Sequence, residues 1–66
     1  MKNTIKVERA KNNWTQADLA DKIGVSRQAI NSIETGKYVP STVLALKMAK
    51  VFSTSVEVIF QLEIAD

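Results

Sequence analysis

Apolar residues recur at helical spacing along this chain, in five short segments separated by residues typical of turns. The first predicted helix covers residues 5–11, after a cap at Asn3 or Thr4. It ends at Asn12 and Asn13, because asparagine tolerates the left-handed conformation that helix C-termini often need.

The second predicted helix begins after Thr15, whose hydroxyl is placed to accept an unpaired backbone N–H while Asp18 reaches back, as in a capping box. Trp14 precedes this cap, where a hydrophobic staple packs, and Gly24 ends the helix at a position that favours positive φ. The helix buries a face of three apolar residues: Leu19, Ala20 and Ile23.

The third predicted helix follows almost at once, since Ser26 caps it two residues after Gly24, and Gly36 ends it. Its apolar stripe falls at i, i+1 and i+4, on Ala29, Ile30 and Ile33. A fourth helix begins after Pro40 and Ser41 and is the most apolar, so we expect it at the centre of the core.

Residues 53–55 interrupt the apolar pattern, and Ser55 caps a short fifth helix over residues 56–60. The chain then alternates, with Phe60, Leu62 and Ile64 apolar, which predicts a strand. Its partner is either Met1 to Asn3 of the same chain or the equivalent segment of a second subunit. A frayed tail is the third alternative.

These elements predict an all-α fold, a compact five-helix domain with a short strand pair at the termini. A length of 66 residues leaves room for a single domain over residues 1–66, without a second domain for sensing or chemistry. The sequence has no cysteine and no histidine and no clustered carboxylates, so we expect no metal site, no cofactor, no evident small-molecule ligand and no enzymatic activity.

Charge and hydropathy narrow the partners further. No apolar run has the length of a membrane span and the start lacks a signal peptide, so we expect a cytoplasmic protein without membrane contact. Residues 1–37 hold seven basic and four acidic residues, whereas residues 38–66 hold two and three. This split suits phosphate contact on one side and self-association on the other, but on charge alone an ordinary solvated surface is the preferred interpretation.

The second and third predicted helices are joined by too few residues to lie antiparallel. Gly24 at the corner, with Val25 packing inward, makes them cross at a steep angle in a helix-turn-helix arrangement over about residues 16–35. The third helix then presents polar residues that suit the DNA major groove: Ser26, Arg27, Gln28, Asn31 and Ser32.

The run Trp14–Lys37 resembles the phage repressor/Cro family of helix-turn-helix proteins, and residues 40–60 resemble that family's fourth and fifth helices. Seven residues fall at family-typical spacing: Gln16, Ala20, Gly24, Ile30, Glu34, Gly36 and Lys37. The length and apolar tail are similar to short stand-alone dimeric repressors of the cytolysin-regulator kind. Three residues depart from the pattern: Glu8 replaces a large apolar residue, and Asn13 and Ser53 stand at helix ends that are usually glycine.

The resemblance implies a sequence-specific transcriptional regulator of double-stranded DNA. Arg27 and Gln28 match the first positions of the recognition helix, where they would bind guanine and adenine through paired hydrogen bonds. Ser32 and Asn31, about one turn further along, are further base-reading candidates; the alternative is that all four are solvated surface residues.

The resemblance also assigns contacts to the DNA backbone. It implies that Gln16 meets a phosphate at the start of the second helix and braces Gln28 of the next helix. Five more residues are candidates for phosphate contacts: Thr15, Asn13, Ser26, Lys37 and Tyr38.

Two further assignments concern structure and assembly. The resemblance implies an ion pair between Arg9 and Glu34 that holds the recognition helix at a set angle. Five apolar residues near the C-terminus, over about residues 56–66, are candidates for a homodimer interface: Val56, Ile59, Phe60, Leu62 and Ile64. A role in the monomer core is the alternative for Val56 and Ile59.

A two-fold dimer would place its recognition helices about one DNA turn apart (~34–36 Å), which predicts a palindromic operator. A repressor is the leading interpretation. A restriction-modification controller protein, an antitoxin, and a protein-interaction module that has lost DNA binding stay open as alternatives. The operator sequence, the regulated genes and the inducing signal do not follow from these residues.

Overall fold

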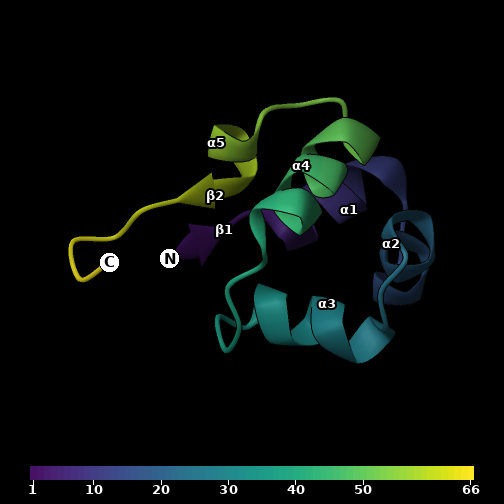
Figure 1. The fold of residues 1–66 in the computed structure, drawn as a ribbon. Helices are drawn as coiled ribbons and strands as arrows, with labels where there is room; N and C mark the ends of the chain where they lie inside the picture. Colours follow the sequence, from purple (N-terminus) through teal and green to yellow (C-terminus); the bar gives the residue numbers. More distant parts are fainter.

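The computed structural model describes residues 1–66 and contains five α-helices and a two-stranded antiparallel sheet (Figure 1). The elements follow the order β1 (Lys2–Asn3), α1 (Ile5–Asn12), α2 (Gln16–Ile23), α3 (Arg27–Glu34), α4 (Thr42–Val51), α5 (Val56–Ile59) and β2 (Phe60–Gln61). The prediction of a five-helix fold with a terminal strand pair is confirmed. No helix has the length and apolar character needed to cross a membrane.

Side-chain caps define the starts of the middle helices. At α2 the Thr15 hydroxyl accepts the Asp18 backbone N–H at 3.0 Å, and the Asp18 carboxylate accepts the Thr15 backbone N–H at 2.9 Å. The Ser26 and Ser41 hydroxyls cap α3 and α4 in the same way. Ser55 stands at the start of α5, but its side chain makes no capping bond.

Four residues in the left-handed conformation make the sharp corners. Gly24 and Gly36 have φ of 74° and 78°, which follows from their lack of a Cβ atom. Asn13 and Ser53 have φ of 56° and 54°, so the departures from glycine leave these two corners in the same conformation.

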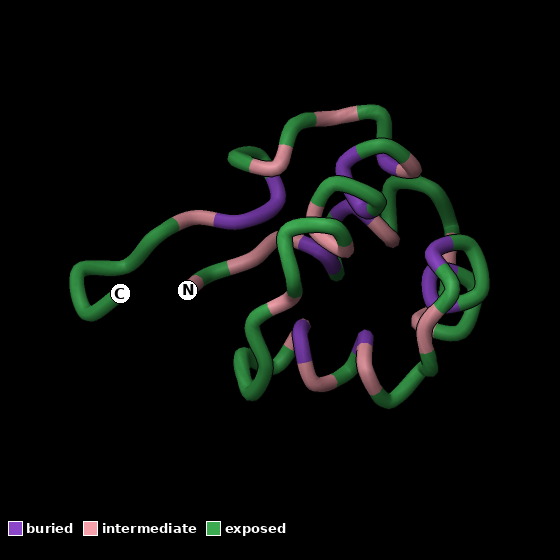
Figure 2. Tube along the Cα trace, in the orientation of Figure 1, coloured by how far each residue is buried: buried purple, intermediate pink, exposed green.

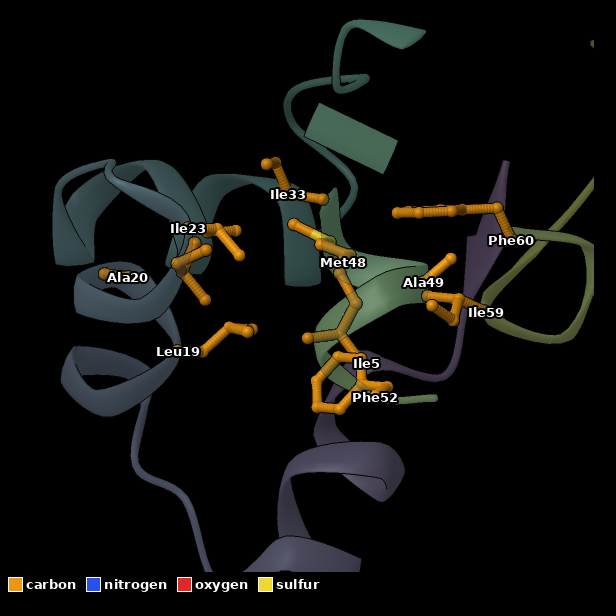
Figure 3. Close-up of a cluster of buried hydrophobic side chains, with 11 residues drawn as sticks. Ile5, Leu19, Ala20, Ile23, Ile33, Met48, Ala49, Phe52, Ile59 and Phe60 are labelled. Carbon is orange, nitrogen blue, oxygen red and sulfur yellow. The ribbon is translucent and has the colours of Figure 1, made fainter. Parts of the chain in front are cut away.

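The core lies where α1, α2, α3, α4, α5 and β2 converge (Figures 2 and 3). Its largest fully buried side chains are Ile5, Leu19, Ile30, Ile33, Met48 and Ile59. Trp14 stacks on Phe52 with ring centroids 5.4 Å apart, and the Lys22 ammonium lies 4.6 Å from the centre of the Trp14 ring. Glu8 is the one charged residue in the buried set, and its carboxylate pairs with the Lys11 ammonium at 3.1 Å.

The two ends of the chain lie side by side (Figure 1). Lys2 pairs with Gln61 and Asn3 pairs with Phe60, so the strand pairing occurs within the chain. The expected strand over residues 60–64 is too long, because β1 has only two residues and leaves no backbone partner beside Leu62 and Ile64. Residues 62–66 are exposed and end in a turn in which Asp66 accepts the Glu63 backbone N–H at 2.8 Å.

Candidate nucleic-acid interface

The helix α3 forms one side of the domain and packs chiefly against α2 (Figure 1). The corner between them closes through a hydrogen bond from the Val25 backbone N–H to the Ala20 carbonyl at 3.0 Å. Ile30 and Ile33 are buried on the side of α3 that faces the core, whereas its exposed side is polar. A short helix is therefore held by one apolar stripe and offers hydrogen-bonding groups to the outside.

The four base-reading candidates lie on α3, and we call them the polar face of α3: Arg27, Gln28, Asn31 and Ser32. Arg27, Gln28 and Asn31 are exposed and Ser32 is half-buried. Arg27 makes no ion pair within the chain. Because arginine keeps its charge at any physiological pH, its guanidinium is a permanent donor at the start of α3.

The loop after α3 adds two of the backbone-contact candidates to the same surface. Lys37 and Tyr38 line a shallow hollow together with Gln28, Asn31 and Ser32. The structure thus brings a cation and an exposed phenol next to the polar face of α3, and both are groups that can donate hydrogen bonds to phosphate oxygens.

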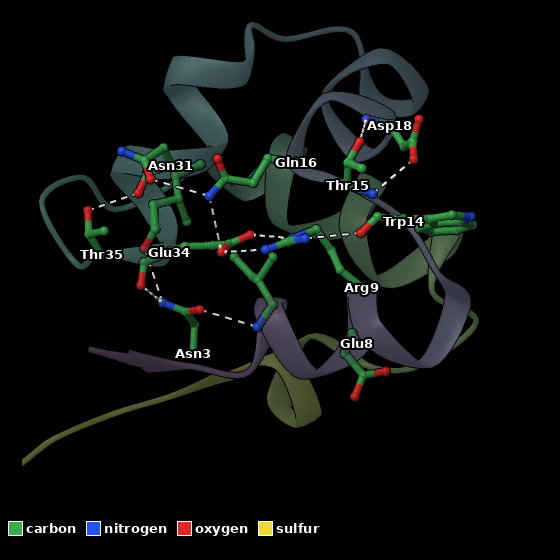
Figure 4. Close-up of polar contacts among 12 residues, drawn as sticks. Asn3, Glu8, Arg9, Trp14, Thr15, Gln16, Asp18, Asn31, Glu34 and Thr35 are labelled. Carbon is green, nitrogen blue, oxygen red and sulfur yellow. Dashed lines mark hydrogen bonds and ion pairs between the residues drawn. The ribbon is translucent and has the colours of Figure 1, made fainter.

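Gln16 lies at the start of α2, but its partners differ from the predicted one. Its side-chain amide donates to the Asn31 side-chain oxygen and to the Glu34 carboxylate, each at 3.3 Å (Figure 4). No hydrogen bond joins it to Gln28 within the chain, and its bracing of Gln28 stays a prediction. Asn31 and Glu34 lie one helical turn apart and face the start of α2, whereas Gln28 lies a further turn toward the N-terminus of α3.

The remaining backbone-contact candidates lie at helix starts and corners. Thr15 and Ser26 are exposed, and both hydroxyls already accept the N–H groups that they cap. The Ser26 hydroxyl keeps its O–H as a donor for a phosphate oxygen, whereas the Thr15 hydroxyl also interacts with the Asp18 carboxylate. Asn13 is exposed in the left-handed corner before α2. These candidates and Gln16 come from the starts of α2 and α3 and from the corner before α2.

Arg9 and Glu34 form the expected ion pair, through two parallel hydrogen bonds of 2.6 and 3.0 Å (Figure 4). The Arg9 side chain is 13% exposed and that of Glu34 8% exposed, so the pair is mostly closed to water. The hydrogen bonds that Arg9 donates to the Glu34 carboxylate raise the pKa of Arg9 above its usual value. Arg9 also donates to the Trp14 carbonyl at 3.0 Å, which ties α1 to the start of α2 as well as to α3.

Asn3 makes polar contacts with α3 that were not predicted from the sequence. Its side-chain oxygen accepts the Ile5 backbone N–H at 3.2 Å, whereas Thr4, the residue at the N-cap position of α1, makes no side-chain capping bond. Its amide also donates to the carbonyls of Ile33 and Glu34, at 3.1 and 3.3 Å. These partners lie 30 and 31 residues away, and no local pattern signals a contact over that separation.

The five dimer candidates separate into two groups. Ile59 is fully buried and Phe60 is 8% exposed within the chain itself, so they have almost no surface to offer to a second subunit. Val56 is half-buried, whereas Leu62 is 82% exposed and Ile64 is fully exposed. The interface prediction is thereby narrowed to Leu62 and Ile64, with Val56 beside the core.

Comparison with known proteins gives matches over most of the chain. A family model described as helix-turn-helix matches residues 5–59. An uncharacterised HTH-type transcriptional regulator of Methanocaldococcus jannaschii is 58% identical over 60 residues, which cover 91% of each chain. The uncharacterised HTH-type transcriptional regulator YgzD of Bacillus subtilis is 48% identical over 63 residues, 96% of each chain. A third such regulator, from Archaeoglobus fulgidus, is 50% identical over 60 residues, 91% of this chain and 84% of its own.

Proposed function

This chain belongs to the Cro/C1-type helix-turn-helix family of transcriptional regulators, and from that premise we propose that it represses transcription as a homodimer bound to a palindromic operator. The observation that carries the proposal is the polar face of α3, which is exposed on a helix whose other side is anchored in the core. Such a protein acts in the cytoplasm by occupying DNA, and this role needs no catalysis.

Arg27 and Gln28 are the residues that we propose to read bases. Both lie in the first turn of α3, the end of a recognition helix that approaches base edges in the major groove. Arginine suits guanine and glutamine suits adenine, and each such pair discriminates by about 1–3 kcal/mol. Asn31 accepts one hydrogen bond from Gln16 on its side-chain oxygen, so its amide hydrogens are the groups left fully available to a base, and Ser32 would contribute a single hydroxyl.

Phosphate contacts would hold α3 in place on the duplex. Gln16, Thr15, Asn13 and Ser26 would meet one stretch of backbone near the starts of α2 and α3, where unpaired N–H groups also attract anions. Lys37 and Tyr38 would meet the backbone beyond the other end of α3. Contacts of this kind add affinity and fix the position of the helix, but they do not select a sequence.

Binding selection from random DNA, carried out with purified protein at two salt concentrations, tests the proposal. We expect an inverted repeat to be enriched and the affinity to fall steeply with salt, because cations that contact phosphates release counterions. Failure to enrich any motif, at salt low enough for general DNA binding, would contradict the proposal and favour a protein-interaction module.

Two substitutions then distinguish a residue that reads a base from a residue that contacts a phosphate. Arg27→Lys keeps the charge but loses the paired geometry, so discrimination at one base pair should fall by about 1–3 kcal/mol. Lys37→Gln should weaken binding to all sequences alike and lower the salt slope by about one for each subunit of the dimer. Lys6→Gln is the matched control, because Lys6 is an exposed lysine on α1 and lies outside the candidate interface.

A further inference from the structure

Asn3 belongs to the terminal strand pair and also contacts the C-terminal end of the recognition helix. As part of β1 it pairs with Phe60 of β2. Its side-chain amide donates to the last two carbonyls of α3, those of Ile33 and Glu34, and Figure 4 shows it reaching from the strand to α3. One side chain thus bridges two elements that are distant in the sequence.

The orientation of this amide is determined by bonds at both of its ends. The last carbonyls of a helix have no donor within the helix. The Asn3 nitrogen supplies a donor to the Glu34 carbonyl and a second donor to the Ile33 carbonyl, which also accepts the Gly36 backbone N–H at 3.1 Å. The Asn3 oxygen accepts the backbone N–H of Ile5, at the start of α1. Because both polar atoms are engaged and the residue is half-buried, rotation of the amide would break several hydrogen bonds at once.

The other polar anchors of α3 come from a different part of the molecule. Arg9 of α1 and Gln16 of α2 bind the Glu34 side chain, whereas Asn3 binds the Glu34 backbone. Asn3 is the residue whose polar contacts join α3 to the strand pair. The strand β2 continues directly into the exposed residues Leu62 and Ile64, the surface that we assign to the dimer.

We propose that Asn3 is a positioning residue that sets the placement of α3 relative to the dimer axis, and thereby the spacing between the two operator half-sites that the protein accepts. This inference rests on the proposed function, since it requires a homodimer on a palindrome. Two recognition helices reach successive major grooves only when they lie about one DNA turn apart (~34–36 Å). A looser connection between α3 and the strand pair allows a wider range of distances between the two recognition helices, without altering the polar face of α3.

The test uses Asn3→Asp in the full chain. Aspartate keeps an oxygen that accepts the Ile5 N–H, but it replaces the amide donor with a second oxygen that faces the carbonyls of Ile33 and Glu34. Asn3→Ser, which keeps a short acceptor and is too short to reach α3, is the second variant in case the aspartate prevents folding. Lys47→Ala is the control, because Lys47 is exposed on α4, outside the surfaces assigned to DNA and to the dimer.

Each protein is titrated against three kinds of duplex: the palindrome recovered by selection, one isolated half-site, and palindromes with one central base pair added or removed. For Asn3→Asp we expect half-site affinity within about twofold of wild type and palindrome affinity lowered about three- to tenfold, the value of one hydrogen bond. The preference for the native spacing over the altered ones should fall by a similar factor. Lys47→Ala should match wild type throughout.

Two results would overturn the inference. One is an unchanged spacing preference in a folded Asn3 variant. The other is a half-site affinity that falls as much as the palindrome affinity, since Asn3 would then support only the folded protomer. The wild-type arm tests the proposed function separately: no preference of the wild type for the palindrome over the half-site would remove the dimer proposal, and this inference with it.

Discussion

The Arg9 guanidinium and the Glu34 carboxylate meet in a site that is mostly closed to water, between α1 and the end of α3. Paired there by two hydrogen bonds, the two charges satisfy each other. A single charge left in the same place would have lost its hydration without compensation. The pair therefore matters for the position of α3 even though neither residue lies on the polar face of α3.

Removing one partner of this pair should lower the stability of the fold. We expect Arg9→Ala to lower the free energy of unfolding by about 3 kcal/mol, the low end of the range for breaking a buried pair. Arg9→Met combined with Glu34→Leu should recover part of that loss, because no charge is left buried alone. Urea denaturation followed by Trp14 fluorescence measures both variants, and unchanged stability of Arg9→Ala would contradict this role of the pair.

Asp18 shows how a cap depends on pH. The hydrogen bond from the Thr15 backbone N–H, and secondly that with the Thr15 hydroxyl, hold the pKa of Asp18 below its usual value. A carboxylate whose pKa is lowered by folding adds stability above its unfolded-state pKa of about 3.9, and that stability is lost as the pH falls through the folded-state pKa.

We therefore expect Asp18→Asn to be less stable than wild type at neutral pH, with the difference shrinking below about pH 4. Thermal unfolding as a function of pH measures the effect. Asp21→Asn is the matched control, because Asp21 is exposed on the same helix and takes no part in the cap. A stability difference that stays constant from neutral to acid pH would argue against the charge of Asp18 as its source.

At the scale of elements, the short helices depend on how their ends are closed. Asn13 ends α1, and Ser53 follows α4, each in the left-handed conformation that glycine adopts without steric cost. Asparagine adopts this conformation more readily than serine, because its side chain forms local hydrogen bonds there. The two corners have nearly the same geometry, and they differ in the strain that their residues impose.

Glycine should relieve that strain unequally. We expect Ser53→Gly to stabilise the fold by about 0.5–1 kcal/mol, the left-handed cost of serine less the backbone entropy cost of glycine. Asn13→Gly should change stability by less than about 0.5 kcal/mol. Paired urea denaturation curves compare the two variants. Equal effects of both substitutions would show that corner strain does not distinguish serine from asparagine here.

At the scale of the whole molecule, the reading and assembly surfaces lie on different elements. The polar face of α3 is on one side of the domain, and the strand pair with the exposed residues Leu62 and Ile64 projects from another (Figure 1). Such a separation would let two copies join through their termini while both recognition helices stay free for DNA.

A charge placed on the terminal surface should therefore prevent self-association. We expect Leu62→Lys, alone or with Ile64→Lys, to shift the protein from dimer to monomer in sedimentation equilibrium. Folding should be unaffected, because both side chains are exposed. Val43→Lys is the matched control: Val43 is also an exposed apolar residue, but it lies on α4. The terminal interface would be disproved by a dimer that survives Leu62→Lys and Ile64→Lys together.

Local chemistry in the sequence determined the elements of this fold. The Thr15 and Ser26 caps, the Gly24 and Gly36 corners and the left-handed Asn13 each depend on a few neighbouring residues, so spacing alone predicts them. The polar face of α3 follows from the same local information, because helical periodicity separates it from the buried stripe of Ile30 and Ile33.

The tertiary structure decided which distant groups meet. It paired the two ends of the chain, directed Gln16 to Asn31 and Glu34 instead of Gln28, and placed Ile59 and Phe60 in the core. It also brought Asn3 to the end of α3, across a separation of 30 residues. Such contacts depend on how whole helices pack and on which polar atoms are left without partners by that packing. Neither can be predicted from residues that are neighbours in the sequence.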